Sequence, residues 1–390
     1  MPNNTSCPHP PQAPKKMRGK RIDFGSWAYI LRFMRRPFVW VVLAVLAASC
    51  ATDPYSKLET ATPTLSPAQI AELQQTAKTP EELGIRMRVT ERSAEFAGVN
   101  VVEAPENVTL PLVEIPTDRP NEPGGLYRQP VIHATVNGKA DVHLLLDSGS
   151  NRNLFSYTLA RSLGIPTIAG LKPMTGLGIG GTVDNYGALV PTLQIGSIGL
   201  QKTVAIIGPD AQVLGVTRGS QVMLLGVNAL RGLSYLTIDY VHGNVIFGAR
   251  EAYLPDDTLP FLTTAPLGWL GDLPAVDITI DGRNPVPCIL DTGGDYGMLV
   301  PRLRAIELGY WKPGKKDPLS IPGGVGGASL ATSYQVREAK VGGATFTRTP
   351  ARTVVIGPEA AGGQVFLGNS VLRRYRVTFD FKHSMLWLER

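Results

Sequence analysis

The stretch Leu144–Ser150, which reads LLLDSGS, is an apolar run that ends abruptly on an acid, a hydroxyl and a glycine. Consecutive apolar side chains are typical of a strand buried on both faces. An aspartate at the end of such a strand is costly to bury unless it is hydrogen-bonded or has a functional role. The pattern recurs at Cys288–Gly294, CILDTGG, where Asp291 takes the place of Asp147. One Asp-Ser/Thr-Gly tripeptide is weak evidence, but two copies in matching contexts indicate a paired feature.

The surroundings of the two acids repeat as well, which points to an internal duplication. Upstream, each copy reads as a strand, a tight turn and a second strand, over Ala134–Gly149 and Asp277–Gly293. The turns contain Asn-Gly and Asp-Gly, pairs that tolerate the positive φ angles of two-residue hairpins. Downstream, Met223–Phe247 and Val365–Leu388 share a Leu-Gly step, a short helix-like turn and alternating strands. The chain is therefore predicted to contain two lobes of one design.

Composition favours an all-β fold for these lobes. The chain has 390 residues, 43% of them hydrophobic, with 42 glycines and 32 prolines and few long amphipathic helical patterns. That length is enough for two domains with their own cores, and the abundance of turn residues is typical of β architectures. We expect a leader at 1–49, a partly disordered tether at 50–124, a first lobe at 125–255 and a second lobe at 256–390.

The basic charge of the chain lies in the leader. Residues 1–49 hold eight of the 38 basic residues and one of the 32 acidic residues, and the rest of the chain has 30 and 31. The net charge of +6 is therefore not a property of the two lobes, which lie in a nearly neutral part of the chain. No nucleic-acid partner is predicted for them.

Within the leader, Met34–Cys50 has basic residues, an apolar stretch from Phe38 to Ala48, small residues and a cysteine. This stretch is short for a membrane span and is typical of a signal-peptide core. The ending Ala47–Cys50 resembles a bacterial lipobox, in which the cysteine is lipidated and becomes the new N-terminus. We expect a lipoprotein of the bacterial cell envelope, anchored in the membrane through Cys50 and facing the periplasm. An uncleaved signal anchor is the alternative.

The tether is rich in Pro, Thr, Glu and Ala and contains one predicted helix. Ser66–Leu83 begins with a plausible cap and an early proline, and we interpret it as a surface helix that spaces the lobes from the membrane. The run Asn107–Ile115 is a candidate edge strand for the first lobe.

The three cysteines exclude a disulfide in the mature chain. Cys7 lies in the leader, Cys50 is the candidate lipid attachment site, and Cys288 remains alone on an apolar strand, where we expect a small core residue. No Cys/His spacing resembles a zinc site, so neither a metal nor a cofactor is predicted.

The motif set resembles the retropepsin and pepsin superfamily of aspartic proteases over residues 125–390. The resemblance implies two retropepsin-like β-barrel lobes with a catalytic cleft between them, to which each lobe contributes one acid, Asp147 and Asp291. It also implies an aspartic endopeptidase that acts on a peptide or protein substrate. Because both lobes lie in one chain, we expect a monomer.

The residues that follow each acid have expected supporting roles. Gly149 and Gly293 let the backbone turn where a side chain would obstruct the approach of the two loops. By the family resemblance, Ser148 and Thr292 hydrogen-bond across to the opposite loop.

Two glycine-rich segments are candidate flaps that close over an extended peptide and bind its backbone. The Leu-Gly steps at Gly226 and Gly368 are expected to pack below the loops of the two acids. The flap residues are Gly178, Ile179, Gly180 and Gly181 in the first lobe and Gly324, Val325, Gly326 and Gly327 in the second.

One departure from the family pattern concerns the residue after the glycine. The first copy has Ser150, a type that the family uses to hydrogen-bond the carboxylate, whereas the second has Gly294. We therefore expect Asp291 to lack one donor and to be the protonated member of the pair.

Two alternatives remain open from the sequence. Each acid taken alone is also compatible with an aspartate that caps a turn. Asp239 and Asp380, which occupy matching places on strands near the lobe ends, are interpreted as structural hydrogen-bonding residues. The chain as a whole is also compatible with a catalytically inactive peptide-binding or scaffolding module on the same fold, with Gly294 as the feature in its favour.

Overall fold

The computed structural model describes residues 64–390 apart from short gaps at 91–92, 117–125, 179–180, 211–221, 260–261, 313–318, 321–322, 325–326, 329 and 357–362. The leader and Cys50 lie outside the described residues. In the part of the chain so described, no helix is both long and apolar enough to cross a membrane.

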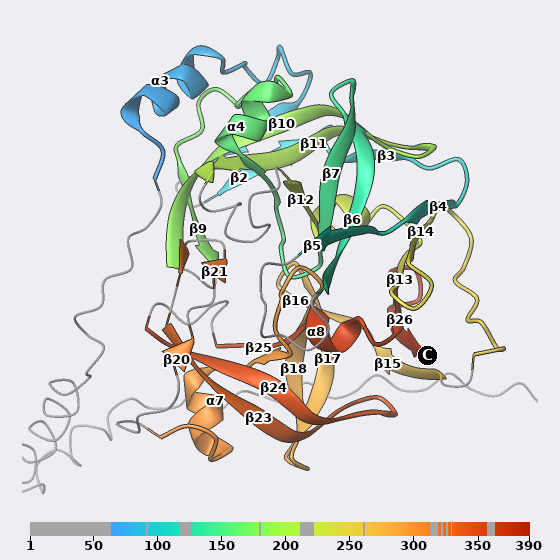
Figure 1. Ribbon diagram of the computed structural model, residues 1–390. Coiled ribbons are helices and arrows are strands. Elements are labelled where there is room, and N and C mark those ends of the chain that lie inside the picture. The colour runs from blue at the N-terminus through green and yellow to red at the C-terminus, as the bar shows by residue number, and fades with distance from the viewer. Residues whose placement is uncertain are drawn as a thin grey trace, which may run out of the picture. The chain divides into compact units, whose positions relative to one another are not determined.

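The first lobe is a nine-stranded sheet that closes into a barrel, because β11 pairs with β10 as well as with β8. Its strands are mostly green in Figure 1. Two short helices, α4 (Tyr157–Ser162) and α6 (Val227–Leu230), follow β8 and β12. The strands are β3 (Val101–Glu103), β5 (Val113–Pro116), β6 (Leu126–Val136), β7 (Lys139–Asp147), β8 (Asn153–Ser156), β9 (Met174–Gly178), β10 (Gly181–Ile195), β11 (Ile198–Gly208) and β12 (Val222–Gly226).

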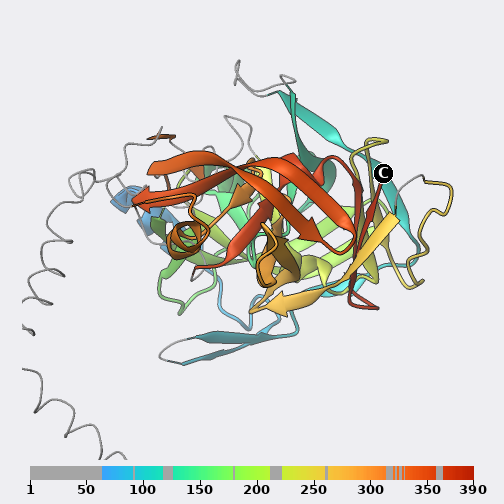
Figure 2. The same ribbon diagram turned by 90° about the horizontal axis from the view of Figure 1, so that it is seen from below.

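The second lobe repeats this barrel with eight strands, closed by pairing of β17 with β23. Helices α7 (Arg302–Glu307) and α8 (Asn369–Leu372) correspond to α4 and α6. The long β23–β24 ribbon is orange to red in Figure 2. The strands are β16 (Gly268–Leu270), β17 (Leu273–Ile280), β18 (Val286–Asp291), β19 (Met298–Leu299), β20 (Leu319–Ser320), β23 (Leu330–Val341), β24 (Ala344–Ile356) and β25 (Val365–Gly368). The predicted all-β fold with two similar barrel lobes is confirmed.

A six-stranded sheet joins the lobes, in the order β15-β27-β26-β13-β14-β4. Its two central strands come one from each lobe, and Thr237 pairs with Thr378 in register, with their hydroxyls 2.8 Å apart. The order reads alike from both ends, as a twofold relation of the lobes requires. The strands are β4 (Val108–Pro111), β13 (Tyr235–Asp239), β14 (Asn244–Gly248), β15 (Leu262–Pro266), β26 (Arg376–Asp380) and β27 (Met385–Glu389).

Asp239 and Asp380 have the structural role that the sequence indicates. Each lies at the end of its central strand and accepts hydrogen bonds from the turn that follows: His242 and His383 donate backbone N–H at 2.9 Å. Because these turns join β13 to β14 and β26 to β27, the two aspartates fix the strand ends of the shared sheet.

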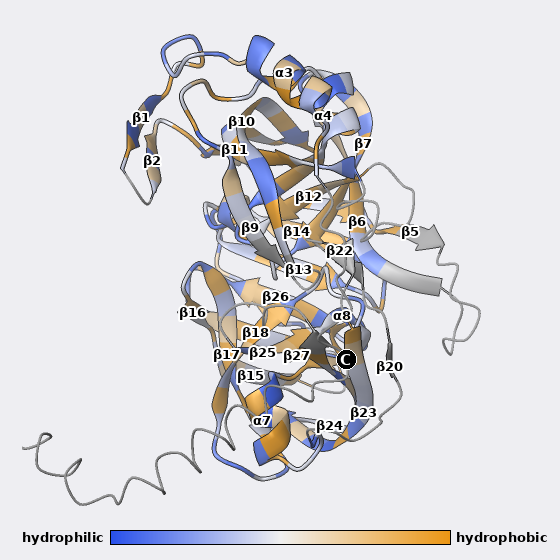
Figure 3. Cartoon of the chain, turned by 90° about the vertical axis from the view of Figure 1, so that its left-hand side faces the viewer, coloured by the Kyte–Doolittle hydropathy of each residue, from blue (hydrophilic) through white to orange (hydrophobic). Residues whose placement is uncertain are grey.

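The core explains why these apolar runs form strands. Leu144, Leu145 and Leu146 on β7 are all fully buried, as expected for a strand covered on both faces. In the second lobe, Cys288 and Leu290 are also fully buried, and both β18 and β25 carry hydrophobic colour in Figure 3. The core cluster that contains Cys288 and Leu290 spans both lobes.

The segment before the first lobe differs from the expected tether. Helix α3 (Pro67–Gln75) begins at the predicted cap, Ser66, with a capping box, but it ends well before Leu83. Strands β1 (Arg86–Val89) and β2 (Ala94–Ala97) form a separate hairpin that the sequence interpretation did not include. The predicted edge strand is present as β4 and β5.

Helix α3 is packed on the first lobe and is not a free spacer. Leu73 is buried, and its carbonyl accepts a 2.6 Å hydrogen bond from the hydroxyl of Thr167. Glu72 pairs with Arg161 of α4 at 2.7 Å. The sequence interpretation did not include this docking, because one buried leucine and a few polar contacts are enough to dock a short helix, and neither is visible as a strong sequence pattern. Spacing of the lobes from a membrane stays a prediction.

Candidate active site

Asp147 and Asp291 are the last residues of equivalent strands. Strand β7 runs parallel to β12 with Asp147 opposite Gly226, and β18 runs parallel to β25 with Asp291 opposite Gly368. A Cβ at Gly226 would lie 2.5 Å from the backbone oxygen of Arg152 in the loop after Asp147. The Leu-Gly steps therefore pack against the acid-bearing loops, and only glycine permits that approach.

The two loops are joined by a reciprocal set of hydrogen bonds. The hydroxyl of Ser148 donates to the carbonyl of Leu290 at 2.6 Å and accepts from the backbone N–H of Thr292 at 3.0 Å. In return, the hydroxyl of Thr292 donates to the carbonyl of Leu146 at 2.6 Å and accepts from the N–H of Ser148 at 3.0 Å. All four bonds are buried, so each loop holds the other in register.

This network brings each acid against the glycine of the opposite loop. A Cβ on Gly149 would lie 2.5 Å from Cγ of Asp291, and a Cβ on Gly293 would lie 2.6 Å from Cγ of Asp147. No side chain fits at either position. The two carboxyl groups are therefore held at the junction of the lobes, each against the glycine of the opposite loop.

The carboxyl groups have different donors. Asp147 accepts a 2.9 Å hydrogen bond from the backbone N–H of Gly149. Asp291 accepts one from the N–H of Gly294 at 2.8 Å and a second, on its other oxygen, from the hydroxyl of Tyr296. The second acid is therefore not short of a donor: Tyr296 supplies a hydroxyl that Gly294 cannot.

The first loop also differs from the expectation. The hydroxyl of Ser150 bonds to the backbone of Arg152, donating to its carbonyl at 2.8 Å and accepting from its N–H at 3.3 Å. It closes a local turn and does not bond to Asp147 through its side chain. Asp147, whose loop looked standard in the sequence, thus lacks a bond from Ser150, whereas Asp291, whose loop looked deficient, receives a side-chain bond from Tyr296.

Burial raises the pKa of both carboxyls above the ordinary value for aspartate. For Asp147 the charge of the neighbouring Asp291 adds to the effect of burial, and its pKa lies well above the usual range. For Asp291 burial raises the pKa, while the bonds from Tyr296 and Gly294 oppose that rise. The sequence-based expectation that Asp291 lacks a donor was wrong, because it counted only the residue at position 294. Which of the two carboxyls holds the proton stays a prediction.

Two further side chains hold the loops that carry the acids. Gln129 on β6 is buried, and its amide donates to the carbonyl of Gly293 at 3.2 Å, across the lobes. The side-chain oxygen of Asn153 accepts from the N–H of Gly226 at 2.9 Å. Sequence reasoning missed both, as it missed Tyr296. A polar residue within an apolar strand context was the available signal for Gln129 and Asn153.

The candidate flaps are present as hairpins at their bases. Gly178 pairs with Gly181 at the end of the β9–β10 hairpin. Strands β21 (Gly323–Gly324) and β22 (Gly327–Ala328) form the matching hairpin of the second lobe. The tips, Ile179, Gly180, Val325 and Gly326, lie outside the described residues. Binding of substrate by these segments stays a prediction.

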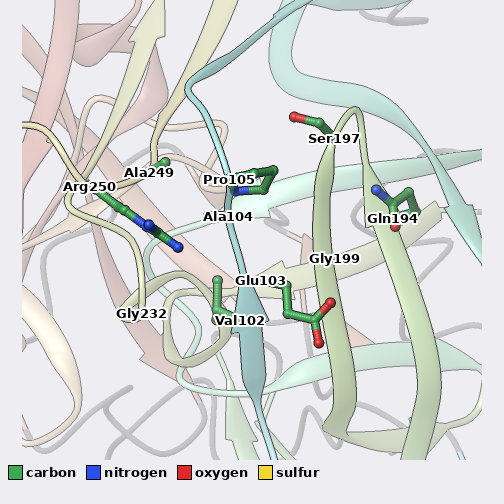
Figure 4. A pocket seen from close by; sticks show the side chains of 10 residues that line it. All are labelled: Val102, Glu103, Ala104, Pro105, Gln194, Ser197, Gly199, Gly232, Ala249 and Arg250. Carbon is green, nitrogen blue, oxygen red and sulfur yellow. The ribbon is translucent and has the colours of Figure 1, made fainter.

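Other candidate sites lie apart from the two acids. Among the residues described, no group of three or more His, Cys, Asp or Glu side chains is arranged to hold a metal ion. Cys288 is buried without a disulfide partner, and burial raises the pKa of its thiol. A cavity of about 590 Å³, shown in Figure 4, contains neither acid. It is lined by Val102, Glu103, Ala104, Pro105, Gln194, Ser197, Gly199, Gly232, Ala249 and Arg250.

Comparison with known proteins agrees with this geometry. Residues 132–229, which include Asp147 and its loop, match a family model described as aspartyl protease. Among solved structures, the chain is similar to the aspartic proteinase from Irpex lacteus, with 14% sequence identity, a TM-score of 0.40, and coverage of 73% of this chain and 97% of that one. No match was found among curated proteins. The family match supports a protease-like function.

Proposed function

We propose that the chain is an aspartic endopeptidase in which Asp147 and Asp291 together activate a water molecule. The observation that carries this proposal is the reciprocal bonding of Ser148 and Thr292, which holds each carboxyl against the opposite loop. An aspartate that only caps a turn has no need for such a partner from the other lobe.

The chemistry follows from the closeness of the two buried acids. Two carboxyls that share one buried site do not ionise together readily, so the pair shares one proton after the first has been lost. The ionised carboxyl accepts a proton from the attacking water, and the protonated carboxyl donates a hydrogen bond to the carbonyl of the scissile peptide. The two acids then exchange roles when the tetrahedral intermediate breaks down and the leaving amine takes up a proton.

The substrate proposed for this site is an extended peptide. The β9–β10 hairpin and its counterpart at β21–β22 contain paired glycines, which have no side chain of their own to cover the backbone N–H and C=O groups. An extended peptide would bind such segments as an additional strand, with its backbone supplying most of the hydrogen bonds.

The test is cleavage of a peptide library by the purified full chain across acidic to neutral pH. The proposal expects cleavage that pepstatin inhibits and that falls by about 10²–10⁴-fold in Asp147→Asn and in Asp291→Asn, because each removes one proton-transfer group. Asp277→Asn, which removes an exposed carboxyl from β17, is the matched control. Cleavage that persists in either dyad variant would exclude the proposed mechanism.

The inactive peptide-binding module remains an outcome of the same experiment. It predicts library peptides that bind the full chain without turnover at any pH, and unchanged binding in Asp147→Asn. The feature that favoured it in the sequence, Gly294, is offset in the structure by the hydroxyl of Tyr296.

We also propose that the protein acts as a monomer anchored to the cell envelope through a lipid on Cys50, with the lobes in the periplasm. One chain supplies both acids, so a second copy is not needed to complete the site. Metabolic labelling with a fatty acid should mark the unchanged protein and not Cys50→Ala, and sedimentation of the detergent-solubilised protein should give the mass of one chain. Labelling of Cys50→Ala would contradict the anchor.

A further inference from the structure

Tyr296 is buried beside one of the two acids. Its side chain is 5% exposed, and its hydroxyl donates to Oδ2 of Asp291, while the N–H of Gly294 donates to Oδ1 at 2.8 Å. The ring packs against a small apolar cluster formed by Ile289, Leu299, Val354 and Phe366. A hydrogen bond to a charged group in such surroundings is stronger than one at the surface.

The first lobe has no equivalent of this bond. The residue at the same distance after Asp147 is Arg152, which is exposed and bonds to the carbonyl of Asn151 at 3.1 Å. The hydroxyl of Ser150 is committed to the backbone of Arg152. Within the described residues, the side-chain donors around the two acids are therefore unequal, and the inequality favours a negative charge on Asp291.

The glycine at position 294 is part of the same arrangement. A Cβ there would lie 2.5 Å from Oδ2 of Asp291 and 2.6 Å from Cε1 of Tyr296. The tyrosine ring and a side chain at position 294 are therefore mutually exclusive. Gly294, which looks like a loss in the sequence, is what admits the tyrosine.

The other ionisable groups near Asp291 do not reverse this preference. Asp147 faces it from the first lobe and donates the shared hydrogen bond when protonated. Cys288, on β18, is buried, and its raised pKa keeps the thiol neutral. Asp295 is paired with Arg352 of β24 at 3.6 Å, so its charge is largely offset.

We propose that Tyr296 is a positioning residue that keeps Asp291 as the ionised member of the pair and leaves the shared proton on Asp147. This inference rests on the proposed endopeptidase function. It assigns direction to the reaction: Asp291 takes the proton from water, and Asp147 donates to the substrate carbonyl. The two lobes, although built alike, then have fixed and different roles.

The direct test is titration of the two carboxyls in the full chain by ¹³C NMR of labelled aspartate, with Asp147→Asn and Asp291→Asn used for assignment. The proposal expects Asp291 to lose its proton at lower pH than Asp147 in the unchanged chain. The reverse order would overturn it. This measurement needs no substrate, so it tests the proposed role of Tyr296 whether or not the chain cleaves peptides.

The second measurement removes only the hydroxyl, in Tyr296→Phe. The pKa of Asp291 should rise by about one to two units, since the lost bond is buried and charged. In the cleavage assay the acid limb of the kcat/KM profile should move to higher pH by a similar amount. The matched control is Tyr310→Phe, which removes a 2.6 Å bond to Asp281 at a hairpin turn away from the dyad.

The pH readout separates a positioning role from a merely structural one. A merely structural role would lower thermal stability or the overall rate in Tyr296→Phe and nothing else. The proposal therefore fails if the pKa of Asp291 and the pH of the acid limb in Tyr296→Phe equal those in Tyr310→Phe. A shift of both, larger than any in Tyr310→Phe, supports it.

Discussion

At the scale of single residues, the hydroxyls of Ser148 and Thr292 have equivalent roles, because each bonds to the backbone of the opposite loop. Thr292 satisfies two buried backbone groups of the first lobe, the carbonyl of Leu146 and the N–H of Ser148. Both bonds are buried. The hydroxyl, and not the bulk of the side chain, is therefore what the position requires.

Replacing Thr292 by Ala should lower the free energy of unfolding by about 1–3 kcal/mol for each buried partner left unsatisfied. Activity should fall as well, because the loops lose their common register. Thr292→Ser keeps the hydroxyl and is the control. Denaturant unfolding monitored by fluorescence gives the comparison, and equal stability of the Ala and Ser variants would contradict the argument.

A second prediction at the scale of single residues concerns Gly149, where there is no space for a Cβ. An added methyl would overlap Cγ of Asp291, so Gly149→Ala should displace that carboxyl and reduce kcat by roughly a hundredfold, as for misplacements of about 1 Å. Gly268→Ala is the matched control, since its nearest neighbour would be an oxygen at 3.7 Å. Wild-type activity in Gly149→Ala would show that the loops are not this close.

The limits of prediction from sequence are visible at the same residues. The pairing of Asp147 with Asp291 could be predicted because the repeat is local and places the same residue types around both acids. The role of Tyr296 does not, because it depends on how the second loop turns at Gly294. Ser150 was misinterpreted for the same reason: its residue type is suitable, but its hydroxyl is used by the local turn at Arg152.

At the scale of elements, the central pair of the shared sheet ties the lobes together. Strands β13 and β26 are antiparallel, and their register places the two buried threonines, Thr237 and Thr378, opposite each other. Each hydroxyl is the partner of the other. This pair joins equivalent residues of the two lobes, and the Ser148–Thr292 network does the same.

A double-mutant cycle on this pair has a definite expected sign. Thr237→Val or Thr378→Val alone removes the bond between the two buried hydroxyls and should cost about 1–3 kcal/mol of unfolding free energy. The double variant should cost less than the sum, since both polar groups are then gone and the shape is kept. Strictly additive losses in denaturant unfolding would show that the hydroxyls do not depend on each other.

Element prediction from sequence succeeded where the pattern was long and apolar and failed where elements were short. The strands that carry the acids are continuous hydrophobic runs, so their existence and burial could be predicted. Strands β1, β2 and β3 have three or four residues each and are mostly exposed, which leaves no periodic signal. The start of α3 was predictable from its cap at Ser66, whereas its contact with Thr167 is a tertiary feature.

At the scale of the whole molecule, the buried acids make stability depend on pH. Burial raises the folded-state pKa of both Asp147 and Asp291 above the value in the unfolded chain. A carboxyl with a raised folded pKa binds protons more tightly in the folded state, so it contributes most stability below the unfolded pKa. That contribution is lost as the pH rises through the folded pKa, which is opposite to the usual behaviour of a paired surface aspartate.

The unchanged protein should therefore lose stability between an acidic pH near the unfolded value and neutral pH, by up to about 1.4 kcal/mol per pH unit for each such group. Asp147→Asn removes the carboxyl whose pKa is raised most, so its unfolding temperature should fall less over the same range and exceed that of the unchanged protein at neutral pH. Asp277→Asn controls for loss of an exposed charge. Thermal unfolding across the pH range measures the difference. Parallel profiles for the unchanged protein and Asp147→Asn would mean that the two carboxyls are solvated. In that case the loops do not hold the two acids together in a buried site.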